Sequence, residues 1–220
     1  MMNTTSRIYS TTDGYKYLFF DLIVLFLLLP FASLHRYLSI LVSFCFLVTL
    51  LLGLNTLAFS KRSLFLFRIF ASLAFISDVV IFPNSEYLTT LSSLMSYSFN
   101  SIFFGLVILA IGSRISREEK VNLNVVRGGV CIYLLLGILW FFFYKILIFF
   151  DGNAFYFPEN ITQNSLFYFS FTTLTTLGYG DILPKNAFAM TFANAEALVG
   201  QIYPAVVIAK LVSLYEHKES

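Results

Sequence analysis

The sequence predicts an all-α membrane protein with six transmembrane helices and one re-entrant helix that enters the membrane without crossing it. Three observations predict this fold class. Of the 220 residues, 58% are hydrophobic and only 12% are charged, whereas soluble proteins carry roughly 25% charged residues. Six apolar segments approach the length of about 20 residues that a helix needs to cross the hydrocarbon core. A shorter apolar segment is followed directly by a glycine-rich stretch.

The six predicted spans follow one another along most of the chain. They cover residues 17–34, 38–59, 64–82, 87–111, 130–150 and 187–214. The segment 163–175 lies between the last two spans and is too short to cross, with polar Gln163 and Asn164 at its start. Non-helical backbone at membrane depth occurs only where it is buried in protein or lines a watery cavity. We therefore expect a re-entrant helix that leads into the glycine-rich stretch.

Basic residues cluster on one predicted side of the membrane. The lysines and arginines of that side are Arg7, Lys16, Lys61, Arg62, Arg114, Arg117, Lys120 and Arg127. The acidic residues of the opposite side are Glu86, Asp151, Glu159 and Asp181, and the exceptions to the pattern are His35, Arg36 and Lys185. Because cytoplasmic loops carry the excess of Lys and Arg, both termini are expected in the cytoplasm. The expected location is a bacterial inner membrane or another plasma membrane.

Composition also excludes several function classes. The net charge of +2 is too small to suggest nucleic acid as a partner. Cys45 and Cys131 both lie inside apolar segments, so buried free thiols are expected rather than a disulfide or a zinc site. The sequence contains no phosphate-binding glycine motif and no recurring cluster of His, Asp and Glu on one face, so we expect neither an enzyme nor an organic cofactor.

The glycine-rich stretch, residues 175–181, reads Thr-Thr-Leu-Gly-Tyr-Gly-Asp. Gly178 and Gly180 can adopt positive φ angles, and their alternation with Leu177 and Tyr179 can turn successive carbonyls toward one side. Four copies around an axis would form rings of oxygens that replace the water shell of a monovalent cation. The potassium filter signature is Thr-Val-Gly-Tyr-Gly, with leucine here in place of valine. An ordinary turn is the alternative, but the position between a re-entrant helix and a full span favours a filter.

From about residue 130 onward, the chain resembles the two-helix pore unit of tetrameric potassium channels. The resemblance implies potassium sites at the Thr176 hydroxyl and at the carbonyls of Thr176, Leu177, Gly178 and Tyr179, with Gly180 completing the outer turn. It also implies a homotetramer surrounded by membrane lipid, because one chain supplies one quarter of a filter. Potassium ions are then the bound species.

The resemblance also implies residues that support the filter. Tyr168 and Phe169 occupy positions where the family often has two aromatic residues, and the Tyr179 ring is expected to pack against the re-entrant helix. Asp181 is expected to anchor the outer end of the filter, although a simply solvated carboxylate is the alternative. Many members have a glutamate where this chain has Thr172, so the hydrogen bonds behind the filter are expected to differ.

The last predicted helix contains three unusual residues. Gly200 lies 21 residues beyond Tyr179, where the family has its hinge glycine, and Pro204 follows one turn later. Proline removes a backbone hydrogen bond and loosens a helix, which favours a gating hinge; close packing at a static kink is the alternative. Glu196 is expected to be hydrogen-bonded within the protein, with a cation or proton site in the pore as the alternative.

The region before the pore lacks the charges of a voltage sensor. Residues 92–111, the core of the fourth span, contain no lysine or arginine, and Arg68 and Asp78 in the third span are too few. The expected organisation is a cytoplasmic tail (1–16), a four-helix region that resembles a voltage sensor in layout (17–112), a cytoplasmic linker (113–127) and a pore unit (128–215).

The sequence thus favours a passive, potassium-selective channel that is not strongly voltage-gated. The alternatives are a subunit of a potassium uptake transporter and a less selective cation channel. Such transporters carry four pore repeats in one chain, whereas this chain has one, and a non-selective channel is expected to have an acidic residue in place of Tyr179.

Overall fold

The computed structural model describes residues 15–32, 35–54, 86–118, 122–159 and 165–216, together with the single helical residues 65, 69 and 72. The chain divides into two compact units, residues 1–135 and 136–220. Helix α6 (Leu123–Phe150) belongs to both, because the boundary falls within it. The predicted third span, 64–82, lies outside the described residues apart from those three positions.

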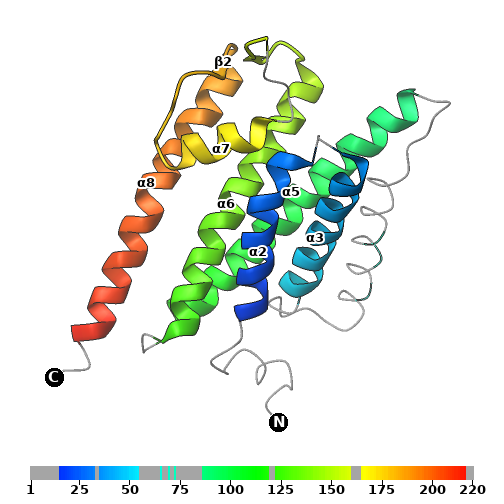
Figure 1. The fold of residues 1–220 in the computed structure, drawn as a ribbon. Helices are drawn as coiled ribbons and strands as arrows, with labels where there is room; N and C mark the ends of the chain where they lie inside the picture. Colours follow the sequence, from blue (N-terminus) through cyan, green and yellow to red (C-terminus); the bar gives the residue numbers. More distant parts are fainter. Residues whose placement is uncertain are drawn as a thin grey trace. The chain divides into compact units, whose positions relative to one another are not determined.

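Within its described residues, the first unit contains three helices and the start of α6 (Figure 1). They are α2 (Lys16–Leu28), which ends in the 3-10 turn η1 (Leu29–Phe31), then α3 (Arg36–Leu54) and α5 (Glu86–Ser116). Helix α2 is shorter than the predicted span 17–34, because Pro30 has no N–H to continue the α-helical ladder. Helices α5 and α6 extend into the predicted linker, 113–127, by several residues at each end.

Apolar side chains hold this unit together. Leu18, Leu22 and Leu25 recur every three to four residues on α2 and are buried, which is the pattern of one helix face turned toward the protein. Between α3 and α5, Phe46 lies 6.2 Å from Phe104, measured between ring centroids. The polar contacts of this unit include Thr49, whose hydroxyl donates a hydrogen bond of 2.5 Å to Asp21, and Tyr15, whose N–H donates to Asn124 over 2.8 Å.

In the second unit, a short helix lies between two long ones. After α6 come the strand β1 (Phe155–Tyr156), the helix α7 (Leu166–Leu174), the strand β2 (Leu183–Pro184) and the long helix α8 (Ala187–Glu216). The two strands pair antiparallel, with Phe155 opposite Pro184 and Tyr156 opposite Leu183. Figure 1 shows α7 passing between α6 and α8, and an extended segment connecting it to β2.

Four described helices are long and apolar enough to cross a membrane. Their apolar segments are Arg36–Gly53, Leu91–Ser116, Leu123–Phe150 and Ala187–Lys210. Helix α7, with 9 residues, is too short to cross, as expected for a re-entrant helix. The first two residues of the predicted segment, Gln163 and Asn164, lie outside the described residues, and the helix as described begins at Leu166.

Candidate functional site

The C-terminal end of α7 binds the backbone of the glycine-rich stretch. The N–H groups of Thr175, Thr176, Leu177 and Gly178 donate to carbonyls of the last turn of α7, at 3.0, 2.9, 2.8 and 3.1 Å. The last two of these bonds share one acceptor, the carbonyl of Thr172. The last carbonyls of a helix have no partner within the helix, so these bonds supply partners that water would otherwise provide. The stretch is thereby fixed to the helix that precedes it.

From Thr176 to Gly180, every second residue has a positive φ angle. The angles are 57° at Thr176, 51° at Gly178 and 77° at Gly180. A Cβ atom added at either glycine would meet no atom within 4 Å, so the backbone conformation rather than space requires glycine there. A β-branched residue at positive φ is a true outlier, and Thr176 is such a residue. The sequence predicted the two glycines but not the threonine.

Tyr168, Tyr179 and Asp181 lie in contact at the C-terminal end of the glycine-rich stretch. The rings of Tyr168 and Tyr179 are stacked, with centroids 6.2 Å apart and planes 6° apart. The Tyr168 hydroxyl donates a hydrogen bond of 2.8 Å to Oδ2 of Asp181, while Oδ1 accepts the N–H of Ile182 over 3.0 Å. The three predicted residues thus lie together in the structure, and both carboxylate oxygens of Asp181 have donors.

Phe169 and Thr172 are placed differently from these three residues. The Phe169 ring lies against Tyr144 of α6 and Phe155 of β1, with centroids 5.1 and 5.3 Å away. It therefore secures α7 to α6 rather than enclosing the glycine-rich stretch. The Thr172 hydroxyl donates back into its own helix, to the Phe169 carbonyl over 3.0 Å. The contribution of Thr172 to the stretch comes from its carbonyl, not from its side chain.

Two glycines allow α7 to approach its neighbours closely. A Cβ atom at Gly200 of α8 would lie 1.8 Å from the carbonyl oxygen of Leu174, the last residue of α7. A Cβ atom at Gly137 of α6 would lie 2.5 Å from the ring of Phe171. The structure therefore gives Gly200 a close-packing role. Helix α8 is continuous through Gly200 and Pro204, and a hinge at these residues stays a prediction.

Asp151 and Asn186 connect the C-terminal end of α6 to the N-terminal end of α8. The Asn186 amide donates 2.7 Å to Asp151, whose other oxygen accepts the N–H of Asn153 over 2.9 Å. These two hydrogen bonds, the Asn186 bond first, lower the pKa of Asp151, and the charge of Lys185 acts in the same direction. Asn186 also accepts the N–H of Ala189 over 2.7 Å, so it caps α8 at its start.

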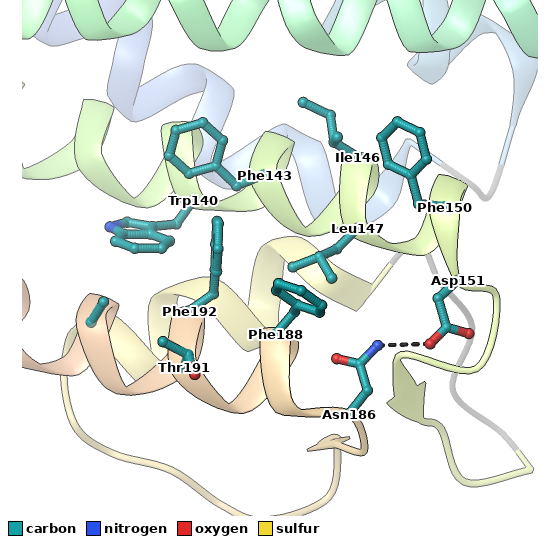
Figure 2. Close-up of a pocket in the computed structure, with 11 residues that line it drawn as sticks. Trp140, Phe143, Ile146, Leu147, Phe150, Asp151, Asn186, Phe188, Thr191 and Phe192 are labelled. Carbon is teal, nitrogen blue, oxygen red and sulfur yellow. Dashed lines mark hydrogen bonds between the residues drawn. The ribbon is translucent and has the colours of Figure 1, made fainter.

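Next to the Asn186–Asp151 hydrogen bond, α6 and α8 line an apolar pocket of about 960 Å³. Figure 2 shows Trp140, Phe143 and Leu147 of α6 near Phe188 and Phe192 of α8, with the Asn186–Asp151 hydrogen bond at one end. The Trp140 and Phe192 rings meet edge to face at 5.7 Å. Such a surface suits apolar side chains or acyl chains.

Comparisons with known proteins place the chain among channels. The family model described as "Ion channel" matches residues 128–217. Protein LctB of Bacillus caldotenax is 30% identical over 137 residues, which cover 56% of this chain and 100% of LctB. The chain belongs to this ion channel family. This membership confirms the expectation of a channel rather than an enzyme.

A second relative comes from a plant. Two pore potassium channel a of Oryza sativa subsp. japonica is 29% identical over 103 residues, 47% of this chain. The match spans 28% of the rice protein. No solved structure matches. The region matched by the family model contains α7, the glycine-rich stretch and α8, which are the elements described above.

Sequence reasoning missed three residues that position α7. Gly137, Tyr144 and Ser170 carry no motif, and their importance arises from contacts between α6, α7 and α8. One signal was available: the buried carboxylate expected at Glu196 requires polar partners. The structure supplies them from Tyr144 and Ser170, so Glu196 is satisfied within the protein, as the favoured interpretation expected.

Proposed function

We propose that this chain is one of four identical subunits of a potassium-selective channel. Residues 175–181 of each subunit supply one quarter of the selectivity filter, and potassium ions bind at the Thr176 hydroxyl and the carbonyls of residues 176–179. The observation that carries the proposal is the alternation of positive φ angles at Thr176, Gly178 and Gly180, at the end of a helix too short to cross a membrane. Rings of carbonyls of this kind replace the hydration shell of potassium.

The rice relative supports potassium as the ion, because it is a two pore potassium channel. The support at the outer end of the filter agrees with this choice. The Tyr168–Tyr179 stack and the bond from Tyr168 to Asp181 hold Tyr179 outward, toward α7. A filter held open in this way matches a potassium ion better than a smaller, more strongly hydrated one. No organic cofactor is required for such passive conduction.

Exposure within the single chain supports a homotetramer. In α8, 11% of the membrane-crossing segment is buried, against 28–39% for the other three described candidates. Leu177 and Tyr179 are 56% and 67% exposed. In the proposed assembly, neighbouring subunits and lipid cover the exposed side chains of α8, Leu177 and Tyr179. They also cover the apolar pocket between α6 and α8.

We further propose six spans with both termini in the cytoplasm, of a bacterial inner membrane or another plasma membrane. Besides the four described helices, α2 with η1 and the segment 64–82 supply the remaining two. The absence of lysine and arginine from residues 92–111 argues that gating is not strongly voltage-dependent. A voltage ramp tests this, since steep sigmoidal activation would contradict it.

Flux through liposomes tests the main proposal. The full chain is purified, its assembled mass is compared with four times 25.1 kDa, and it is reconstituted with potassium or sodium gradients. We expect potassium flux that greatly exceeds sodium flux. Equal flux of the two ions would favour the less selective cation channel, and no flux while valinomycin controls respond would reject a passive channel.

A further inference from the structure

Glu196 lies in the middle of α8 and is completely buried, with 0% of its surface exposed. Its carboxyl group meets one hydroxyl from each of the two helices beside it. Oε1 lies 2.6 Å from Oγ of Ser170 on α7, and Oε2 accepts a hydrogen bond from the hydroxyl of Tyr144 on α6. Ser170 and Tyr144 are also 0% exposed. A single carboxyl group therefore connects all three helices of the pore region.

The count of protons in this cluster identifies its chemical state. Oγ of Ser170 lies 2.6 Å from Glu196 and 2.7 Å from the carbonyl oxygen of Gly137. A serine hydroxyl has one proton to donate, and a carbonyl can only accept. Ser170 could share its one proton between the two acceptors, but each contact has a proton of its own only if Ser170 donates to Gly137 and accepts a proton from Glu196. Tyr144 donates its own proton to the second carboxyl oxygen, so every group in this arrangement has a partner.

An ionised Glu196 would leave one of these contacts without a proton and would bury an unpaired charge. Burying a carboxylate without a counter-charge is strongly unfavourable. Among the described residues, no cation contacts Glu196. The nearest basic residue to Tyr144 in sequence, Lys145, has its ammonium 5.7 Å from the centre of the Phe141 ring. The ionisable side chain of α7, that of Tyr168, donates its hydrogen bond to Asp181.

We propose that Glu196 is a neutral carboxylic acid and a positioning residue that fixes α7 between α6 and α8. The consequence for conduction rests on the function proposed above. Ser170, which Glu196 holds, lies two residues before Thr172, whose carbonyl accepts the N–H groups of Leu177 and Gly178. The chain of contacts therefore runs from the middle of α8 to the filter backbone without passing through a charge.

Substitution by glutamine separates the neutral acid from a required charge. In Glu196→Gln, the amide can donate to Ser170 and its oxygen can accept from Tyr144, with no charge and nearly the same shape. We expect this variant to keep the assembled mass and the potassium-to-sodium flux ratio of the wild type. Glu159→Gln, at an exposed glutamate of the outer loop, is the matched control. Loss of selective flux in Glu196→Gln alone would overturn the proposal.

Removal of the connection tests the positioning role. In Glu196→Leu and Ser170→Ala, the link to α7 is lost, and we expect the potassium-to-sodium flux ratio to fall about tenfold, the equivalent of one buried hydrogen bond. Ser170→Ala adds no bulk, so it remains informative if the leucine variant fails to assemble. Wild-type selectivity in Ser170→Ala would overturn the positioning role.

Infrared spectroscopy tests the protonation state independently of any ion flux. The purified full channel is expected to show the carbonyl stretching band of a protonated carboxylic acid, and Glu196→Gln is expected to lack it. If the band is absent from the wild type, Glu196 is ionised and the proposal is wrong, whichever ion the channel conducts. If the band is present but potassium and sodium fluxes are equal, the proposed function fails and the neutral acid stands.

Discussion

The front region (α2, α3 and α5) and the proposed pore region (α6, α7 and α8) hold their helices together in different ways. Within the described residues of the front region, α2, α3 and α5 meet mainly through leucine and phenylalanine side chains, and Gly53 faces the flexible side chains of Val107 and Phe103. In the pore region, Gly200 faces a backbone carbonyl, and a buried glutamate connects three helices. Apolar side chains can repack after a substitution, whereas a backbone atom cannot rotate away. Substitutions should therefore have larger effects in the pore region.

The largest effect is expected for Gly200→Ala. Its methyl group would lie 1.8 Å from the Leu174 oxygen, so α8 must separate from α7. We expect loss of the assembled channel, a destabilisation on the order of 4 kcal/mol or more, measured as thermal unfolding and assembled mass in detergent. Gly105→Ala in α5 is the front-region control, since its methyl group meets nothing within 4 Å. A stable Gly200→Ala channel with altered open probability would instead favour the hinge.

The second effect concerns the filter backbone itself. Gly178→Ala introduces a side chain at a φ of 51°, which costs about 1–2 kcal/mol in each subunit even though space is available. We expect the potassium-to-sodium flux ratio to collapse while the assembled mass is retained. Gly152→Ala is the matched control, because that glycine also has open space but no positive φ. Equal selectivity in both variants would contradict the proposed filter.

A smaller effect is expected for Tyr168→Phe. The variant keeps the ring that stacks on Tyr179 but loses the hydrogen bond to Asp181. This part-buried hydrogen bond contributes about 0.5–1.5 kcal/mol, so selectivity should decline without loss of assembly. Flux ratios measured beside Tyr156→Phe, at an exposed tyrosine of β1, check this. Identical ratios would mean that the stack alone holds the filter.

The smallest effect is a pH dependence at Asp151. The pKa of Asp151 in the folded protein is below the ordinary value of 3.8, and the largest cause is the hydrogen bond from Asn186. The stabilisation is therefore complete above pH 3.8 and is lost as the pH falls through the lowered pKa. Thermal unfolding measured between about pH 5 and pH 3 should show a decline that Asp151→Asn reduces. An unchanged decline in the variant would assign it to other carboxylates.

Local patterns made part of this molecule predictable. Apolar length indicated the membrane helices, and the need for positive φ identified Gly178 and Gly180 from the sequence alone. The Tyr168–Tyr179 contact followed from a resemblance to a family motif. These features depend on residues that are near one another in sequence.

The rest could not be predicted, because it depends on contacts between distant segments. Ser170 meets Gly137 and Glu196 across 33 and 26 residues of sequence, and neither spacing forms a pattern. The end of α2 at Leu28 has a local cause, Pro30, that a hydropathy profile does not show. The positive φ of Thr176 follows from the bond of its N–H to the end of α7, which no residue preference reveals.

The contact between Gly200 and Leu174 has a mechanical consequence. No side chain stands between α8 and the end of α7, so a shift of α8 at this point cannot be absorbed by a change of rotamer. Force applied to the C-terminal half of α8 would then reach the end of α7, and the backbone attached to it, through this contact. In the proposed channel, the C-terminal half of α8 and the filter would therefore be mechanically coupled, so that a stimulus acting on either would affect the other.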